Sequence, residues 1–307
     1  MTTVLFKRRM LQCVLTISSI FIGHSVTGQI RSAGIQYYDN QYLSNPAFAG
    51  ASEGFIFNMN YRNRWRSIPG SPVTMSATGD YRYENIGLGV NIYNEKAGLI
   101  GRTRIVGTYA YHLTLDDFGR SLHFGISLGA MNQKLDNASI IADPNDVLPE
   151  RFNARKTYLD GDFGVAFISN GLTLQGALPN LKKFFQKDEQ NTIDGSTYFA
   201  AMSFKLGAAN EMFAFEPKIS VRGAKDIKSI IDIGTNLRTF DNILSVMGMY
   251  HSDKSSTLGL GINVEKYQLN LFYTSEMGGK LQSTGTDIEL NLKINLSNSY
   301  SRKATLL

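Results

Sequence analysis

Cysteine and histidine, which supply disulfides and most transition-metal ligands, are scarce in this sequence. There is one cysteine, Cys13, in an apolar N-terminal run, and there are four histidines in 307 residues. Three of these lie beyond the first 28 residues, at His112, His123 and His251, and no HxH or HExxH motif occurs. Removing the N-terminal run on export would leave no disulfide and no thiolate ligand. The sequence therefore predicts no metal site.

Motifs of enzyme active sites are missing as well. The GLG stretches at 87–89 and 259–261 lie in strand-like runs and open no helix, so they are not phosphate-binding loops. They suit places where a strand curves or approaches another chain closely. Asp160 and Asp162 share one face of a predicted strand, where they either bind a cation or pair with arginines. No Ser, His and Asp set stands out, and we expect a non-enzymatic protein without a cofactor.

The N-terminus has the layout of an export signal. Basic residues at 7–9 precede an apolar run at 10–22, which is shorter than the ~20 residues that a membrane-spanning helix needs. Small residues before Gln29 fit a signal-peptidase site, so 1–28 is predicted to be a signal peptide, with an N-terminal anchor as the alternative. Its removal lowers the net charge from +5 to +2, because three cations and no anions are lost. The basic balance therefore does not indicate nucleic acid as a partner.

The mature chain shows no sustained helical period. Short runs of aromatic, β-branched and glycine residues recur instead, and apolar side chains alternate with small or polar ones, as in Leu122, Phe124 and Ile126. The pattern predicts about fourteen strands, at 53–66, 72–83, 86–94, 102–115, 121–134, 157–168, 171–178, 197–207, 212–223, 227–239, 242–251, 256–264, 266–275 and 285–296.

Tight and long connections separate these strands in a regular way. The even-numbered connections are tight, and the odd-numbered ones include three long loops, at 135–156, 179–196 and 276–284. Short turns on one side, longer loops on the other and an even strand count are typical of bacterial outer-membrane barrels. The fold class predicted is all-β, a transmembrane antiparallel up-and-down β-barrel of about 14 strands. Its expected parts are a plug-like periplasmic segment at 29–52, the barrel at 53–296 and a C-terminal tail at 297–307, and a soluble β-sandwich is the alternative.

Charged residues opposite the apolar faces are expected to line a polar lumen. An Arg or Lys on the lipid face costs ~2–4 kcal/mol at the membrane midplane. The residues expected inside are Asp80, Arg82, Arg104, Asp160, Asp162, Glu216, Lys218, Arg222, Asp232, Arg238, Glu289 and Lys293. Aromatic residues near strand ends suit interfacial girdles or ordinary cross-strand packing, namely Tyr61, Trp65, Tyr81, Tyr83, Tyr93, Tyr109 and Tyr111.

A barrel of fourteen strands encloses more space than the side chains of its own wall fill. Water, a plug or a partner must occupy the remainder. The segment before the first strand is rich in tyrosine and poor in strand signals. We therefore hypothesise that Tyr37, Tyr38, Tyr42 and the turn at 45–50 fold into or against the barrel.

Four stretches of the chain carry a resemblance to a known family. They are NPAFAG at 45–50, YRNRW at 61–65, IGLGVNIYNEKAG at 86–98 and LHFGISLGA at 122–130. In this order they resemble the PorP/SprF family, outer-membrane proteins of the type IX secretion system of Bacteroidetes. The likeness covers nearly the whole mature chain, and NPAFAG to YRNRW is its most specific part. The segment at 32–40 departs from the family, because it lacks the usual start containing Asp-Pro.

The resemblance implies a non-enzymatic role in the cell outer membrane, in export or surface attachment of secreted proteins. Adhesins with a type B C-terminal signal, including gliding-motility adhesins, are examples of such cargo. The partners implied are outer-membrane lipid, periplasmic components of the type IX secretion machinery, and a secreted adhesin or its C-terminal domain. The matching positions, expected to be structural or partner-contacting, are Asn45, Pro46, Ala47, Gly50, Tyr61, Arg62, Asn63 and Trp65, and Tyr38 and Tyr42 join them as plug residues.

Two transporters of other classes remain as alternatives. A FadL-like channel for hydrophobic solutes also has fourteen strands and an N-terminal hatch, but the strands here are short for it. A simple diffusion porin is disfavoured, because no single long loop is built for a constriction.

Overall fold

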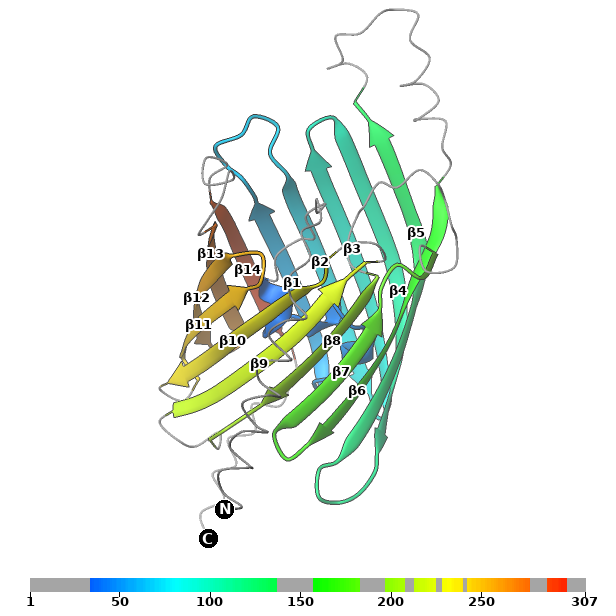
Figure 1. Cartoon of the computed structure of the whole chain (residues 1–307). Helices are drawn as coiled ribbons and strands as arrows, with labels where there is room; N and C mark the ends of the chain where they lie inside the picture. Colours follow the sequence, from blue (N-terminus) through cyan, green and yellow to red (C-terminus); the bar gives the residue numbers. More distant parts are fainter. Residues whose placement is uncertain are drawn as a thin grey trace, which may run out of the picture.

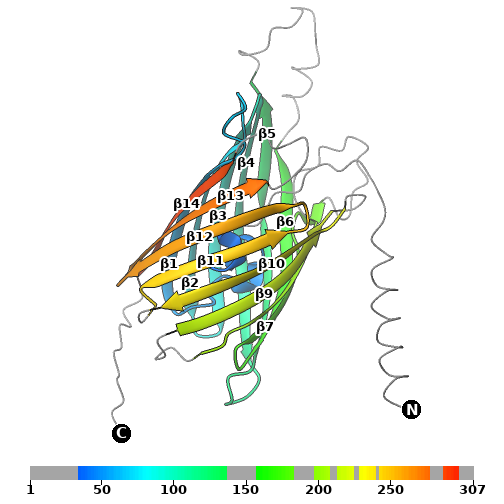
Figure 2. The same ribbon diagram turned by 60° about the vertical axis from the view of Figure 1, so that its left-hand side comes forward.

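The computed structural model describes residues 34–136, 157–182, 197–207, 213–224, 228–239, 242–276 and 286–296. Fourteen antiparallel strands form one closed barrel, in which each strand pairs with its neighbours in the sequence and the last pairs with the first (Figures 1 and 2). The strands are β1 Gly54–Asn63, β2 Val73–Tyr83, β3 Ile86–Ala97, β4 Ile100–Thr114, β5 Ser121–Leu135, β6 Tyr158–Ser169, β7 Leu172–Leu178, β8 Tyr198–Phe204, β9 Phe213–Gly223, β10 Ile230–Thr239, β11 Leu244–His251, β12 Ser255–Val264, β13 Tyr267–Glu276 and β14 Asp287–Asn295.

The barrel closes between β1 and β14, where Met59 lies opposite Leu292 and Asn60 opposite Asn291. The side chains alternate across this seam as they do elsewhere. Met59 is 47% exposed on the outer face, whereas Asn291 is 1% exposed on the inner face. A closed sheet pairs the backbone of every strand within the wall, which is what a strand needs in hydrocarbon. Apolar side chains outside and polar ones inside make the surface that lipid requires.

The strand count, the pairing and most strand ends agree with the sequence prediction. The two-residue turns at Glu84, Asn170 and Glu265 have positive φ angles of 52°, 43° and 52°, the backbone that a tight hairpin demands. Four boundaries differ by three residues, among them the end of β3, which continues to Ala97, and the start of β10, at Ile230. β1 stops at Asn63, because Trp65 adopts a φ of 51° that breaks the strand. β8 stops at Phe204, so the connection after it is longer than predicted.

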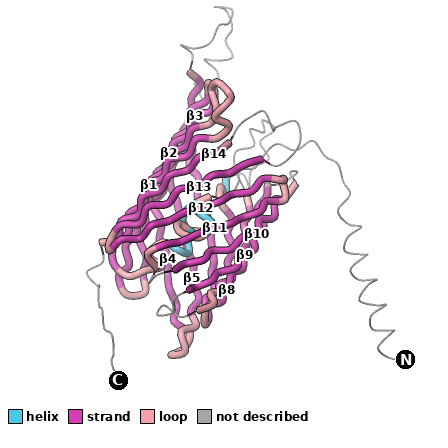
Figure 3. The backbone as a smooth tube through the Cα atoms, turned by 90° about the vertical axis from the view of Figure 1, so that its left-hand side faces the viewer, coloured by secondary structure: helices cyan, strands magenta, loops and turns pink. Residues whose placement is uncertain are grey.

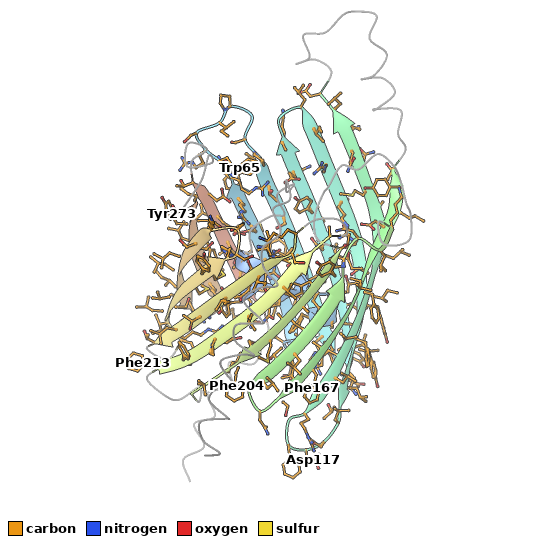
Figure 4. All side chains as sticks on the ribbon, in the orientation of Figure 1. Trp65, Asp117, Phe167, Phe204, Phe213 and Tyr273 are labelled. Atoms are coloured by element: carbon orange, nitrogen blue, oxygen red, sulfur yellow. The ribbon has the colours of Figure 1, made fainter. Side chains whose placement is uncertain are left out.

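The aromatic residues divide between the two faces of the wall. Tyr81, Tyr83, Tyr109 and Tyr111 are exposed on the outside. Phe204, Phe213 and Tyr273 also stand out from the wall, whereas Trp65 lies at one end of the barrel and Asp117 at the other (Figure 4). The girdle interpretation is wrong for Tyr93, which shares its face with the buried Asn91 and lines an internal cavity.

The two ends of the barrel are different. We call the end with the β2–β3, β4–β5 and β6–β7 turns the short-turn end, and the opposite end the long-loop end. The wall of β2 to β5 rises well beyond β7 to β10 at the long-loop end (Figure 1). Within the described residues, no helix is long and apolar enough to cross a membrane. The predicted signal peptide at 1–28 and the tail at 297–307 lie outside the described residues.

Candidate functional site: the occupied interior of the barrel

The segment that precedes β1 lies inside the barrel. It forms three single-turn 3₁₀ helices, η2 Ile35–Tyr37, η3 Gln41–Leu43 and η4 Pro46–Phe48, which Figure 3 shows enclosed by the strands. Tyr37 and Ala47 are at most 1% exposed. We call Ile35–Gly50 the inner segment.

Two tyrosine hydroxyls of the inner segment bind opposite parts of the wall. Tyr37 donates to the backbone carbonyls of Lys218 at 2.7 Å and Asp232 at 3.0 Å. Tyr42 donates to Thr108 Oγ1 at 2.7 Å. Burial raises the pKa of both hydroxyls well above their usual range, so they remain neutral donors at physiological pH. Tyr38 stacks edge-on against Tyr37, with ring centroids 4.8 Å apart.

The sequence NPA explains the shape of η4. Asn45 caps the helix, because its Oδ1 accepts from the Ala47 backbone N–H at 3.0 Å. Pro46 occupies the first helical position, where its missing N–H costs nothing. The Asn45 amide also donates to the Val165 carbonyl at 3.1 Å and to Gln175 Oε1 at 3.3 Å. One side chain therefore shapes the turn and attaches it to β6 and β7.

Inward-facing glycines make the space that η4 occupies. A Cβ at Gly125 would lie 2.2 Å from the Pro46 carbonyl carbon, and one at Gly164 would lie 1.9 Å from Asn45 Oδ1. A Cβ at Gly87 would lie 2.0 Å from the Ala49 carbonyl oxygen. Any larger residue would have to displace the inner segment. All three glycines mark a close approach of the inner segment to the wall, a use that the sequence suggested only for the GLG stretches, of which Gly87 is a member.

Gly50 ends the inner segment in a left-handed conformation, with a φ of 64°. Its N–H donates to Asp80 Oδ2 at 2.9 Å, and its carbonyl accepts from Arg82 Nη1 at 3.4 Å. A residue with a side chain is strained at this φ. Gly50 thus directs the chain from the lumen into β1.

Sequence reasoning missed Asp39 and the contacts by which two lysines hold the inner segment. Asp39 Oδ1 accepts from Gln268 Nε2 at 2.9 Å, and the Asp39 carbonyl accepts from Lys293 Nζ at 3.4 Å. Lys218 Nζ donates to the Tyr37 carbonyl and, at 2.9 Å, to Gln41 Oε1. The lysines belong to the expected lumen charges, but nothing in the sequence connected them to Asp39 or Tyr37.

The other charged residues expected in the lumen lie on the inner face, several of them in ion pairs. Arg104 binds both carboxylates of β6, Asp160 at 3.1 Å and Asp162 at 2.7 Å. This is the arginine pairing that the sequence left open beside cation binding. The further pairs are Arg62–Asp287 at 2.9 Å, Arg62–Glu289 at 4.0 Å, Arg222–Asp232 at 2.8 Å and Arg238–Glu216 at 3.9 Å.

The antiparallel register of β4 and β5 brings together two histidines that are eleven residues apart in the sequence. His112 and His123 are cross-strand neighbours with their Nδ1 atoms 2.9 Å apart, and His112 Nε2 lies 3.0 Å from the Ala49 carbonyl. His251 lies elsewhere, with Nδ1 2.6 Å from Asp232 Oδ1. In the described part of the chain, no group of three or more His, Cys, Asp or Glu is arranged to hold a metal ion.

The YRNRW residues do not meet the NPAFAG residues. Tyr61 is 39% exposed on the outer face. Asn63 and Trp65 lie at the long-loop end, where Asn63 accepts from Ser71 at 3.4 Å and the Trp65 N–H donates to Asp287 at 3.2 Å. The family-like residues therefore serve two places, the inside of the barrel and its long-loop rim.

A cavity of about 200 Å³ lies between the inner segment and the long-loop end. Its lining includes backbone and side chains of Gly34–Gln36 and Tyr42–Pro46. The wall contributes residues near the long-loop ends of the strands, mostly polar, among them Asn60, Arg62, Arg64, Thr74, Asn91, Tyr93, Arg104, Asp162, Arg222 and Glu289. We call this space the upper cavity.

Comparison with solved structures returns outer-membrane proteins at low identity. Omp33 of Acinetobacter baumannii is 9% identical with a TM-score of 0.49, covering 80% of this chain and 99% of its own. The CymD monoaromatic hydrocarbon channel is 11% identical with a TM-score of 0.49, covering 87% and 93%. The P. putida toluene transporter TodX is 10% identical with a TM-score of 0.46, covering 88% and 94%.

At these scores, the architecture is established by the strand pairing of this chain itself. No curated protein matches the chain. The family model for the type IX secretion system membrane protein PorP/SprF matches residues 27–294, nearly the whole length. The chain therefore belongs to the PorP/SprF family of type IX secretion system membrane proteins.

Proposed function

We propose that this outer-membrane barrel is a non-enzymatic component of type IX secretion whose pore is closed by the inner segment. In this role it supports export or surface attachment of secreted proteins, such as adhesins with a type B C-terminal signal. The observation that carries the proposal is the position of Tyr37, Tyr42 and Asn45, which bind four different strands across the lumen. A barrel closed in this way offers a docking surface rather than a path for solutes.

The two ends of the barrel suit different partners. In bacterial outer-membrane barrels the short turns face the periplasm and the longer loops face outward. Periplasmic components of the secretion machinery would therefore meet the short-turn end. A secreted protein outside the cell would meet the loops, the rim around Trp65 and the upper cavity. Gly50 and Asp80 lie toward the short-turn end and are better placed to hold the inner segment than to touch such a partner.

The upper cavity does not suit the two alternative functions. A site for hydrophobic solutes is lined mainly by apolar side chains, whereas this cavity is lined by Arg62, Arg64, Arg104 and Arg222 among other polar residues. A diffusion porin needs a continuous aqueous path, and the inner segment lies across it. Single-channel conductance of the purified barrel would support a porin, and a co-purified detergent-like ligand would support a FadL-like transporter.

A pull-down from native outer membranes tests the proposal. The tagged protein is expected to retain a large secreted protein or periplasmic secretion components, identified by mass spectrometry. Two variants separate the ends: Trp65→Ala at the long-loop rim and Asp117→Ala, which is exposed in the β4–β5 turn. Loss of the secreted protein in the Trp65 variant alone would place it outside. Recovery of neither class of partner from the wild type would contradict the proposal.

A further inference from the structure

The upper cavity is rich in arginine on all sides. Arg62 and Arg64 come from the β1 end, Arg104 from β4 and Arg222 from β9, and only Asp162 and Glu289 are acids in the lining. Further carboxylates, Asp160, Asp232 and Asp287, pair with these arginines from the wall. The guanidinium groups, which are charged at all physiological pH values, therefore face a shared space.

Arg222 has a donor left over. Its Nε and Nη2 donate to Asp232 at 2.8 and 2.9 Å. Its Nη1 is buried and has no hydrogen-bond partner among the residues that the structure describes, although the residue is only 3% exposed. A buried guanidinium N–H without a partner is costly, so a ligand oxygen at this position would be favoured.

Unused acceptors lie on the opposite side of the same cavity. Asn60 Oδ1 and Asn91 Oδ1 are buried without a partner in the described ranges, and both residues line the cavity. The Asn60 amide is engaged with Glu289. β1 and β3 lie across the closed barrel from β9. The lining of the cavity thus includes a residue with an unused buried donor on one wall and two residues with unused buried acceptors on the other.

A peptide bearing a carboxylate has the complementary groups. Its carboxylate oxygens accept from a guanidinium, and its backbone N–H groups donate to amide oxygens. A cavity of about 200 Å³ is smaller than the ~300–1,000 Å³ of pockets for drug-sized ligands. A space of this size takes a short stretch of peptide and excludes a folded domain.

We propose that the upper cavity binds a carboxylate carried by an extended peptide, with Arg222 Nη1 as donor to the carboxylate and Asn60 and Asn91 as acceptors. The peptide enters from the long-loop end and rests on Gly34 and on Ile35 and Gln36 of the inner segment. The carboxylate comes from a chain terminus or from an Asp or Glu side chain. Only the assignment of this peptide to a secreted partner rests on the proposed function.

Trp65 provides a natural reporter of binding. It is the only tryptophan in the chain, and the Arg64 guanidinium carbon, whose residue lines the cavity, lies 4.8 Å from the centroid of its ring. The experiment titrates the full mature barrel in detergent with three short peptides while Trp65 fluorescence and heat of binding are recorded. One ends in a free carboxylate, one is amidated, and one is amidated but carries an internal glutamate.

The free acid is expected to bind and the plain amide to bind at least about tenfold more weakly, as for loss of a hydrogen bond to a charged group. Binding of the third peptide would assign the site to side-chain carboxylates instead of a terminus. Arg222→Gln is expected to weaken carboxylate binding at least about tenfold, and Arg120→Gln, an exposed cation at the short-turn end, to leave it unchanged.

Asn91→Asp alters no ion-paired residue and adds a negative charge to the acceptor wall, so it should weaken binding of the free acid and tests the site even if Arg222→Gln fails to fold. Equal binding of acid and amide, or full competition by inorganic phosphate at the peptide's concentration, would overturn the proposal. These assays contain no secretion partner. A failed pull-down therefore leaves the peptide result standing, and failed peptide binding leaves the pull-down result standing.

Discussion

The two halves of the barrel interior are built differently. Toward the short-turn end, the inner segment packs directly on glycines such as Gly87 and Gly125, and side chains of the wall bind its backbone, His112 at the Ala49 carbonyl and Asp80 at the Gly50 N–H. Toward the long-loop end, arginine–carboxylate pairs such as Arg104–Asp162 surround an unfilled cavity. The first half is filled by the packed inner segment, and the second is lined by charged side chains. Mutations should therefore affect the two halves in separable ways.

Gly125→Val is expected to have the largest effect on the half filled by the inner segment. Its Cβ would fall 2.2 Å from the Pro46 carbonyl carbon, so the inner segment must leave its place or the barrel must fail to fold. Overpacking of this kind costs ~1–3 kcal/mol or more. The yield of folded barrel, measured by heat-dependent gel mobility, should fall. Gly107→Val is the matched control, because a Cβ there has nothing within 4 Å, and an equal loss in both variants would contradict the steric account.

Alkaline pH should loosen the inner segment before it affects the arginine pairs. Burial raises the pKa of the hydroxyls of Tyr37, Tyr38 and Tyr42 well above the unfolded value of about 10. Because the raised pKa belongs to the folded state, this stability is complete below pH ~10 and is lost as pH rises further. The loss is at most ~1.4 kcal/mol per pH unit for each tyrosine.

Guanidinium unfolding of the barrel in micelles at pH 8, 10 and 11 measures this dependence. The arginines stay charged over that range, so the ion pairs should persist. A free energy of unfolding that does not change between pH 10 and 11 would show that the tyrosines are not buried as described.

Tyr42→Phe should have the smallest effect. It removes one hydrogen bond to Thr108, worth ~0.5–1.5 kcal/mol. Thr108 keeps its contact with Ser127 at 2.6 Å, so no buried group of the wall loses its last partner. Tyr109→Phe, on the outer face of the same strand, should change the unfolding midpoint by less. The two variants compare the loss of a hydroxyl inside the barrel with the loss of one on its outer face. A larger effect of Tyr109→Phe than of Tyr42→Phe would contradict the position of Tyr42 inside the barrel.

The barrel could be predicted from the sequence because the signals that specify its strands and turns lie in residues close together in the chain. The alternation of Leu122, Phe124 and Ile126 with polar or small residues repeats in nearly every strand. Because the barrel is surrounded by lipid, the apolar side chains of each strand must face outward. Turn residues such as Glu84 and Glu265 then set the ends. The strand count and the closed antiparallel order followed from these signals.

The contacts inside the barrel were less accessible to sequence reasoning. The pairing of His112 with His123 depends on the cross-strand register, and the contacts of Asp39 depend on which part of the inner segment reaches β13 and β14. Tertiary packing of one irregular segment against many strands leaves no periodic signal. The turn at 45–50 was the exception, because the chemistry of a turn lies in adjacent residues, although the cap that Asn45 makes was not predicted.

Single-channel conductance in planar bilayers tests the central claim, that residues Ile35–Gly50 close the barrel, most directly. A chain of residues 29–307, without the predicted signal peptide, and a chain lacking residues 1–46 are refolded in the same way and recorded side by side. The account predicts little or no conductance for the first and a stable open channel for the second. Equal conductance in the two would contradict it.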